Sequence, residues 1–282
     1  MQLKKGSTGK YVKQLQEILG ITVDGDFGLK TEIAVKDYQQ DNGLRTDGIV
    51  GSKTWAEMSK PKVEYTHAGI QLTVIGKGYE WFSNGDYNVN IVGVRNSATK
   101  GKVTNLYDDH ITMSYKIDGE WKFHCWQATT DPGQHWIDNP MNSRGGTAIL
   151  VPGQYSGVYK IDKHNGKYEA LCQRNGKVEV YRDGNKDKQY DYDEDSTQEG
   201  YFGINIHRSS AYKVGNYINK YSAGCQVFAD PDDFDEFMEV CYKVSDEWGN
   251  KFTYTLIEIQ DSQTEDEILQ SKFNNNYQDN DL

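Results

Sequence analysis

An internal repeat near the N-terminus constrains the fold of this chain more than any other feature. The segment Asp24-Gly-Asp-Phe-Gly-Leu-Lys-Thr31 recurs as Asp47-Gly-Ile-Val-Gly-Ser-Lys-Thr54, so the pattern D-G-x-x-G-x-x-T occurs twice. In each copy the Asp-Gly pair is typical of a turn, the second glycine permits a positive φ, and an apolar residue between them can point inward. The Ser or Thr that follows lies near a helix start, where it can cap. Each copy is therefore predicted to join two helices.

Three helices are predicted around these two turns. Gly20 closes the first, the second spans Lys30 to Gln40, and the third is a short helix from Ser52 to Met58. The apolar residues expected to face the core recur at helical spacing: Val12, Leu15, Ile18, Leu19, Ile33, Ala34, Val35 and Tyr38.

With its doubled turn and three helices, the segment 3–58 resembles the peptidoglycan-binding domain 1 family, a three-helix module. The resemblance implies that residues 1–60 form a module that binds bacterial peptidoglycan. The alternative is a small helical bundle that serves as an interaction module for another ligand. The sequence does not identify which side chains would touch glycan.

Composition and charge exclude several classes of partner. The net charge of -11 over 282 residues argues against nucleic acid, because phosphate binding needs a basic face. No apolar run approaches the length of a membrane-spanning helix, so stable membrane insertion is not expected. The segment that starts at Met1 has no charged region followed by an apolar one. We therefore expect no signal peptide, synthesis in the cytoplasm, and release to the cell wall by another route.

The rest of the chain has the pattern of a mainly β domain. A linker is predicted over 61–68, a β-rich domain over 69–260, and a polar tail over 261–282. Strands are predicted where apolar runs lie between Gly, Asn and Asp turns: Leu72–Ile75, Tyr87–Val94, Ile111–Ile117 and Trp121–Trp126. One late helix is predicted over Asp232–Tyr242. The expected fold class is α+β and multidomain.

The residues that carry chemistry lie late in the chain. An apolar strand ends at His207, and a turn of small residues presents Cys225 after Ser222. A thiol becomes a useful nucleophile when a nearby imidazole accepts its proton. The other three cysteines, Cys125, Cys172 and Cys241, are scattered and lack metal-ligand spacing. Neither zinc nor a disulfide framework is predicted.

The ordered set of motifs resembles the catalytic domain of the L,D-transpeptidase (YkuD-like) family, over roughly 110–245. The matching residues are His207 and, 18 residues later, Cys225 at the end of Ser222-Ala-Gly-Cys. Upstream, the segment 126–133 resembles the family's strand that ends in S-T-G, and the segment 146–155 takes the place of its T-P-x-G-x-[FY] loop. The resemblance implies a YkuD-like β-sandwich.

The resemblance also implies a mechanism. Cys225 would attack the carbonyl of a donor peptide and form a thioester, with His207 as general base, oriented by the carbonyl of Arg208. The amides of Gly224 and Cys225 would stabilise the oxyanion. Ser222 would hold the turn, although an ordinary turn hydroxyl is an equal alternative. No cofactor is required for this chemistry.

Three positions depart from the family pattern, which leaves the second substrate open. Ala223 stands where the family has His or Arg, and Gln226-Val227 stand where Arg or Asn is frequent; these positions help to shape the acceptor side. A wall-binding module without a leader resembles phage lysins, so we expect a wall-degrading or wall-modifying peptidase. A true L,D-transpeptidase that forms 3→3 cross-links is the first alternative. A catalytically inactive wall-binding structural protein is the second.

An acidic segment offers a candidate calcium loop. Oxygen ligands fall at the register of an EF-hand loop, at Asp183, Asn185, Asp187, Asp191 and Glu194. However, Lys188 occupies the position where that loop needs glycine, and no helical flanks are evident. A solvated acidic turn between strands is therefore the favoured interpretation, and a structural calcium ion is the alternative.

Overall fold

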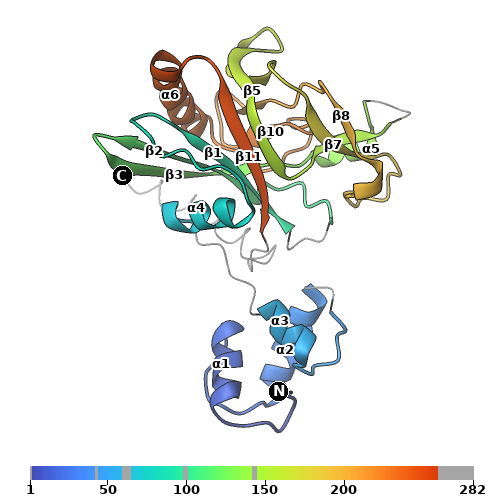
Figure 1. Ribbon diagram of the computed structural model, residues 1–282. Helices are drawn as coiled ribbons and strands as arrows, with labels where there is room; N and C mark the ends of the chain where they lie inside the picture. Colours follow the sequence, from blue (N-terminus) through green and yellow to red (C-terminus); the bar gives the residue numbers. More distant parts are fainter. Residues whose placement is uncertain (1, 42–43, 59–64, 98–100, 142–144, 260–282) are drawn as a thin grey trace, which may run out of the picture. The chain divides into compact units, whose positions relative to one another are not determined.

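The computed structural model describes residues 2–41, 44–58, 65–97, 101–141 and 145–259 (Figure 1). These residues form two compact units, one that ends within the first 62 residues and one that follows it. The predicted tail over 261–282 and the first half of the predicted linker, 61–64, lie outside the described residues. The α+β multidomain architecture is confirmed: a helical unit precedes a larger, mainly β unit.

The first unit contains the three predicted helices. They are α1 (Lys10–Ile18), α2 (Leu29–Asp41) and α3 (Ser52–Met58). Its core consists of Leu3, Val12, Leu15, Phe27, Val35 and Val50. The predictions that Ile18 and Ile33 face this core are wrong, because the two residues are 38% and 50% exposed. Polar Gln39 and Thr31 occupy the inward face of α2 instead.

Two buried glutamines explain why the turn repeat folds as it does. The amide oxygen of Gln16 accepts the N–H of Gly25 at 2.8 Å, while its nitrogen donates to the carboxylate of Asp24 at 2.7 Å. Gln39 makes the same two bonds to Gly48 and Asp47, at 2.8 and 3.1 Å. The repeat thus extends to a glutamine eight positions before each Asp, a signal that the sequence contained.

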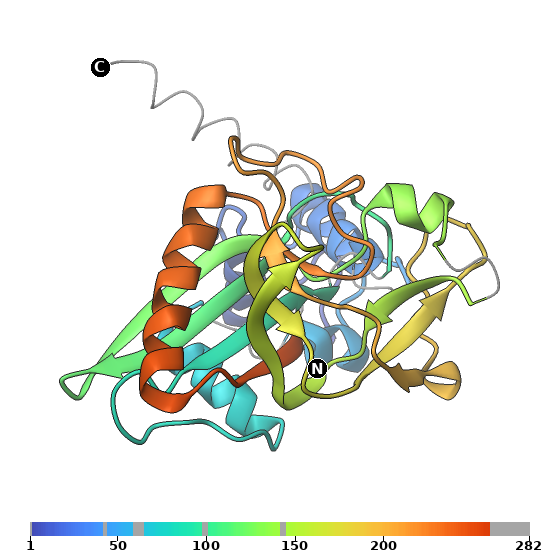
Figure 2. The same cartoon turned by 90° about the horizontal axis from the view of Figure 1, so that it is seen from above.

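The larger unit is built on an eight-stranded closed barrel in the order β1-β11-β5-β6-β9-β10-β3-β2 (Figures 1 and 2). A separate sheet has the order β4-β7-β8. The expected β-sandwich thus takes the form of a barrel with a small sheet beside it. The strands are β1 (Asn90–Asn96), β2 (Asp109–Ile117), β3 (Glu120–Thr129), β4 (Thr147–Leu150), β5 (Gly153–His164), β6 (Tyr168–Gln173), β7 (Val178–Asp183), β8 (Gln198–Gly200), β9 (Ile206–Arg208), β10 (Gln226–Phe228) and β11 (Phe252–Ile259).

Helices complete this unit: α4 (His67–Gly76), α5 (Gln134–Asp138), the one-turn η2 (Glu194–Ser196) and α6 (Pro231–Trp248). The predicted late helix is confirmed as α6, and it is longer at both ends. Its Phe234 and Phe237 pack with Phe228 of β10 in the main core. Asp230 caps the helix by accepting the N–H of Asp232 at 2.9 Å.

The strand predicted over Leu72–Ile75 is wrong, because this segment belongs to α4. The side chain of Thr66 accepts the N–H of Gly69 at 3.1 Å and so starts a helix. Helical spacing then buries Ile70 and Val74 against the outward faces of β1 and β11. Leu72 is left 71% exposed. β1 is therefore buried on both faces, inward by the barrel and outward by α4.

No helix of the described residues is both long enough and apolar enough to cross a membrane.

Candidate active site

The parallel pairing of β9 with β10 brings the predicted nucleophile and base to one face of the sheet. The register aligns Gln226 with Ile206 and Val227 with His207. Cys225 therefore lies beside Asn205, one step before the paired residues. Side chains at alternate positions of a strand share a face, so those of Cys225, Asn205 and His207 project to the same side. Diagonal neighbours in a sheet are roughly 7–8 Å apart, within reach of an aromatic ring.

His207 is buried and held in one tautomer. Its Nδ1 lies 2.8 Å from the carbonyl oxygen of Arg208. A carbonyl only accepts, so Nδ1 carries the proton and Nε2 is left with its lone pair. Burial lowers the pKa of His207 to about 3, with the nearby ring of His164 as the next cause. The imidazole is therefore neutral at pH 7 and able to accept a proton at Nε2.

The thiol of Cys225 is partly exposed and rests in its protonated form. The backbone N–H of Asn205 donates to Sγ at 3.4 Å, and the thiol donates to the carbonyl of Gly203 at 3.5 Å. Burial raises the pKa of Cys225 to about 11, although the Asn205 amide opposes that effect. Between the described side chains of Cys225 and His207 there is no direct hydrogen bond. The resting site thus holds a neutral thiol and a neutral imidazole.

The turn before Cys225 is fixed by Ser222. Its hydroxyl donates to the carbonyl of Cys225 at 2.7 Å and accepts the N–H of Gly224 at 3.2 Å. Gly224 has a φ of 117°, and a Cβ there would lie 2.2 Å from the carbonyl oxygen of Ala148, so only glycine fits. The prediction that the Gly224 amide is free for an oxyanion is therefore corrected. The amide of Cys225 has no acceptor among the described residues.

The two upstream segments of the family resemblance both contact this turn. Gly133, at the end of the first segment, donates its N–H to the carbonyl of Ser222 at 2.9 Å. Ala148, in the second segment, lies against Gly224 through its carbonyl. Segments far apart in the sequence thus support the same turn.

Gln226 and Val227 do not shape an acceptor side, because both are wholly buried. Gln226 donates through Nε2 to the carbonyls of Gly224 at 3.3 Å and Thr130 at 3.4 Å, and it accepts the hydroxyl of Tyr254 at 2.7 Å. The expectation that these two positions help to shape the acceptor side is therefore wrong. The Gly224 carbonyl and the Cys225 N–H belong to the same planar peptide group. By holding the carbonyl, Gln226 therefore also fixes the direction of the N–H.

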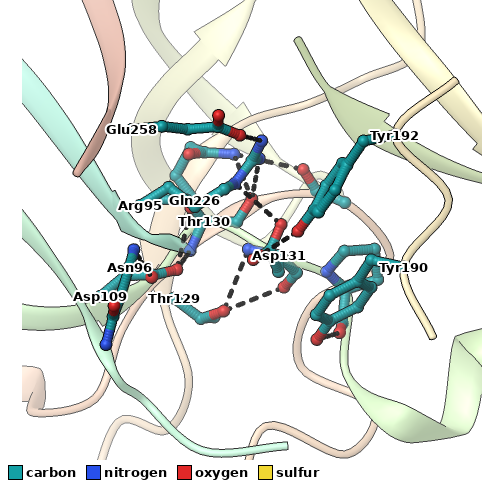
Figure 3. Close-up of polar contacts among 12 residues, drawn as sticks. Arg95, Asn96, Asp109, Thr129, Thr130, Asp131, Tyr190, Tyr192, Gln226 and Glu258 are labelled. Atoms are coloured by element: carbon teal, nitrogen blue, oxygen red, sulfur yellow. Dashed lines mark hydrogen bonds and ion pairs between the residues drawn. The ribbon is translucent and has the colours of Figure 1, made fainter. Parts of the chain in front are cut away.

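A buried polar cluster lies behind Gln226 and was not singled out from the sequence (Figure 3). Its centre is Arg95 of β1, only 1% exposed, which pairs with Asp131 at 3.0 Å and Glu258 at 3.4 Å. Its Nη2 also donates to the carbonyl of Thr130 at 3.1 Å, which it shares with Gln226. Removal of one partner would leave a buried charge unpaired, which strongly destabilises a folded protein. The cluster joins β1, β10 and β11 directly behind the turn of Cys225.

Asp109 supports the same cluster from β2. Its carboxylate accepts the N–H of Asn96 at 2.7 Å and both the N–H and the hydroxyl of Thr130, at 2.7 and 2.8 Å. Burial, partly opposed by Arg95, raises the pKa of Asp131. Tyr192 donates to Asp131 at 3.5 Å. An arginine in a strand gives no sequence signal of burial, because only long-range pairing supplies its partners.

The candidate calcium loop starts at the end of β7. Asp183 is 0% exposed, and neither of its carboxylate oxygens has a hydrogen-bond partner. Asn185 and Asp187 instead cap the local turn, since they accept the N–H groups of Asp187 and Gln189. Burial first, then Asp191 and Asp187, raises the pKa of Asp183 to about 6.

The side chain of Glu194 lies outside the described residues. Within the part of the chain that the structure describes, no three His, Cys, Asp or Glu side chains converge as a metal site. The choice between an acidic turn and a calcium loop therefore stays a prediction.

The other cysteines are not placed for the same chemistry. Cys172 and Cys241 are buried, and burial raises the pKa of both thiols. Cys125 is exposed on β3, where burial of the thiol itself raises the pKa to about 12. Its neighbour His124 stacks between Tyr115 and Trp126 on the other face of the strand.

Residues 8–58 match the family model described as "Putative peptidoglycan binding domain". The match covers most of the first unit and speaks for that unit alone. A curated relative from Kitasatospora aureofaciens, described as an uncharacterized protein in bpoA1 3'region, is 43% identical over 63 residues. That alignment spans 20% of this chain and 53% of the relative, so the chain covers about half of that protein's length.

A solved structure from Clostridium acetobutylicum ATCC 824 was also found. It is a fused Zn-dependent amidase/peptidase/peptidoglycan-binding domain-containing protein, 15% identical, with 91% of this chain and 99% of that chain covered. The TM-score is 0.25, which is too low to indicate a shared fold.

Proposed function

We propose that this protein is a peptidoglycan-binding cysteine enzyme that acts on the peptide stems of the bacterial cell wall. The family match over 8–58 supports wall binding by the first unit. The single observation that supports catalysis is the register of β9 and β10, which presents Cys225 and His207 on one face with Nε2 of His207 unprotonated.

The chemistry follows from these positions. The sulfur of Cys225 attacks the carbonyl carbon of the donor peptide as its proton passes to Nε2 of His207. The oxyanion so formed accepts a hydrogen bond from the backbone N–H of Cys225. Gln226 holds the peptide group to which this N–H belongs. Collapse breaks the C–N bond, the leaving amine takes the proton from His207, and a thioester remains on Cys225.

The resting protonation states define how the first step must occur. With the pKa of Cys225 raised to about 11 and that of His207 lowered to about 3, a preformed thiolate–imidazolium pair is unfavourable. Proton transfer therefore accompanies attack on the carbonyl, as for a hydroxyl nucleophile activated by general base catalysis.

Water then resolves the thioester in the reading that we propose, which makes the protein a wall-degrading or wall-modifying peptidase of the kind used by phage. Ala223, partly exposed beside Cys225, leaves the approach to the thioester open. An acceptor amine would give a 3→3 cross-link instead. Gln226 and Val227 are buried, so they favour neither of these outcomes. The products therefore decide between these two outcomes.

The test is turnover of defined tetrapeptide muropeptides, with products identified by mass spectrometry. Cys225→Ala should abolish turnover, and Cys125→Ala, an exposed thiol of the same unit, should retain it as the matched control. Hydrolysed products should outnumber 3→3 dimers, with only a modest change as acceptor concentration rises. Turnover by Cys225→Ala contradicts the nucleophile, and a majority of dimers at low acceptor concentration makes the protein a transpeptidase.

A further inference from the structure

A second histidine, His164, lies outside the motifs around His207 and Cys225 and contacts both halves of the candidate site. His164 ends β5 and is 9% exposed. Its ring stacks on that of His207, with centroids 4.0 Å apart and planes 27° apart. Its partner across the β5–β6 hairpin is Tyr168. The hydroxyl of Tyr168 donates to the carbonyl of Arg208 at 3.2 Å, the same carbonyl that receives His207 Nδ1–H. The end of this hairpin therefore contacts His207 through two side chains.

His164 also reaches Cys225, through Asn205. The side-chain oxygen of Asn205 accepts the N–H of Gln173 at 2.9 Å, which turns its amide nitrogen toward His164 Nδ1, 3.0 Å away. The backbone N–H of the same Asn205 donates to Cys225 Sγ, and its carbonyl accepts the N–H of Gln226 at 2.9 Å. One residue thus connects His164 to the thiol and to the strand that carries it.

These bonds determine the protonation state of His164. Because the Asn205 amide donates to Nδ1, that nitrogen must be unprotonated, and the ring proton of a neutral imidazole is on Nε2. The amide nitrogen of Asn165 lies 2.9 Å from Nε2, and a 180° rotation of that amide places its oxygen there to accept the Nε2–H. Burial, with Arg174 and Lys167 adding to it, lowers the pKa of His164 and so favours this neutral form.

We propose that His164 is a positioning residue, which restrains the His207 ring by stacking and holds Cys225 in register with it through Asn205. This inference rests on the proposed function, since it assigns a role within the same Cys225–His207 site. His164 touches no reacting atom. Its effect is on how often the base and the thiol stand in the geometry from which attack proceeds.

Two substitutions separate the two contacts. His164→Phe retains an aromatic ring for the stack but loses the acceptor for Asn205. His164→Gln offers an acceptor but no ring. The matched control is His124→Phe, because His124 is also an imidazole stacked between aromatic rings, on β3 of the same unit. Alkylation of the buried Cys172 and Cys241 by iodoacetamide reports whether any variant has opened the fold.

The first readout is the Nδ1–H proton of His207 in nitrogen-15-labelled protein. We expect a resolved signal in the wild type, in His124→Phe and in His164→Phe, and a signal broadened by exchange with water in His164→Gln. The second readout is turnover of tetrapeptide muropeptides. We expect kcat to fall by about tenfold to a hundredfold in His164→Gln and less in His164→Phe, with KM within twofold, because misplacement by about 1 Å costs up to this much.

A wild-type kcat together with an intact His207 signal in His164→Gln would overturn the positioning role. So would a loss confined to KM, or an equal loss in His124→Phe. If the wild type itself turns over no muropeptide, the proposed function fails. The His207 signal in the two His164 variants still decides whether the restraint exists.

Discussion

The buried carboxyl of Asp183 should make the stability of the larger unit depend on pH in a calculable way. Its pKa is raised from 3.8 to about 6 in the folded protein, because the group is buried and lies near the carboxylates of Asp191 and Asp187. The difference corresponds to about 3 kcal/mol. The folded pKa lies above the unfolded one, so the folded state binds the proton more tightly. Below pH 4 this group does not reduce the free energy of unfolding. The reduction grows as the pH rises from about 4 to 6, and it is complete above pH 6.

Asp183→Asn removes the titrating group and retains the shape. The buried amide has its own cost of desolvation, but that cost does not vary with pH. The change in unfolding free energy on substitution should therefore be more favourable at pH 8 than at pH 4, by about 2–3 kcal/mol. Urea denaturation followed by tryptophan fluorescence measures it, since five of the six tryptophans, all but Trp55, lie in the larger unit. Asp195→Asn, an exposed residue near the same loop, is the control and should show no such change.

The same denaturation experiment with added calcium tests whether Asp183 binds an ion instead. If Asp183 bound an ion, millimolar calcium would stabilise the wild type relative to chelator, and Asp183→Asn would lose that stabilisation. We expect the two conditions to give the same midpoint. An effect of the substitution that is equal at pH 4 and pH 8 would refute the assignment of a raised pKa.

Further outcomes can be checked on the same protein. Alkylation of Cys225 by iodoacetamide, read by peptide mass spectrometry, should rise about tenfold per pH unit from 7 to 9, because its pKa is raised to about 11; a plateau by pH 7 would indicate a preformed ion pair. Gln16→Leu and Gln39→Leu should each destabilise the first unit by about 1–3 kcal/mol, since turn groups lose their partners, whereas Gln14→Leu on the exposed face of α1 should not; thermal melting of that unit distinguishes them. Removal of residues 1–62 should weaken sedimentation with purified sacculi yet preserve turnover of soluble muropeptides; equal sedimentation would argue against wall binding by this unit.

Local chemistry explains what the sequence predicted well. The Asp-Gly turns, the bounds of α2 and α3 and the start of α6 follow from turn residues, caps and apolar spacing within a few positions of each other. The same holds for the fold class, because alternating apolar runs report strands wherever they pair. Part of the candidate site could also be identified from the sequence, because Cys225 lies close in the chain to Ser222 and Gly224, which support its turn.

Long-range burial explains what the sequence did not predict. Leu72–Ile75 has the composition of a strand, but its segment forms a helix because the outward faces of β1 and β11 bury Ile70 and Val74 at helical spacing. Ile33 is exposed because Thr31, Val35 and Gln39 form the inward face of α2, and residue 33 lies on the opposite side of the helix.

The side chains that surround the thiol are likewise set by the tertiary structure. The sequence by itself determined that a His-to-Cys interval and a small-residue turn were present. Only the order of strands in the barrel decided that Gln226 faces the interior and that Arg95 supports the turn from behind. The same order brings His164, at the end of a distant hairpin, under the ring of His207. Partners that meet by strand pairing leave no local pattern, because their contacts depend on register and not on spacing along the chain.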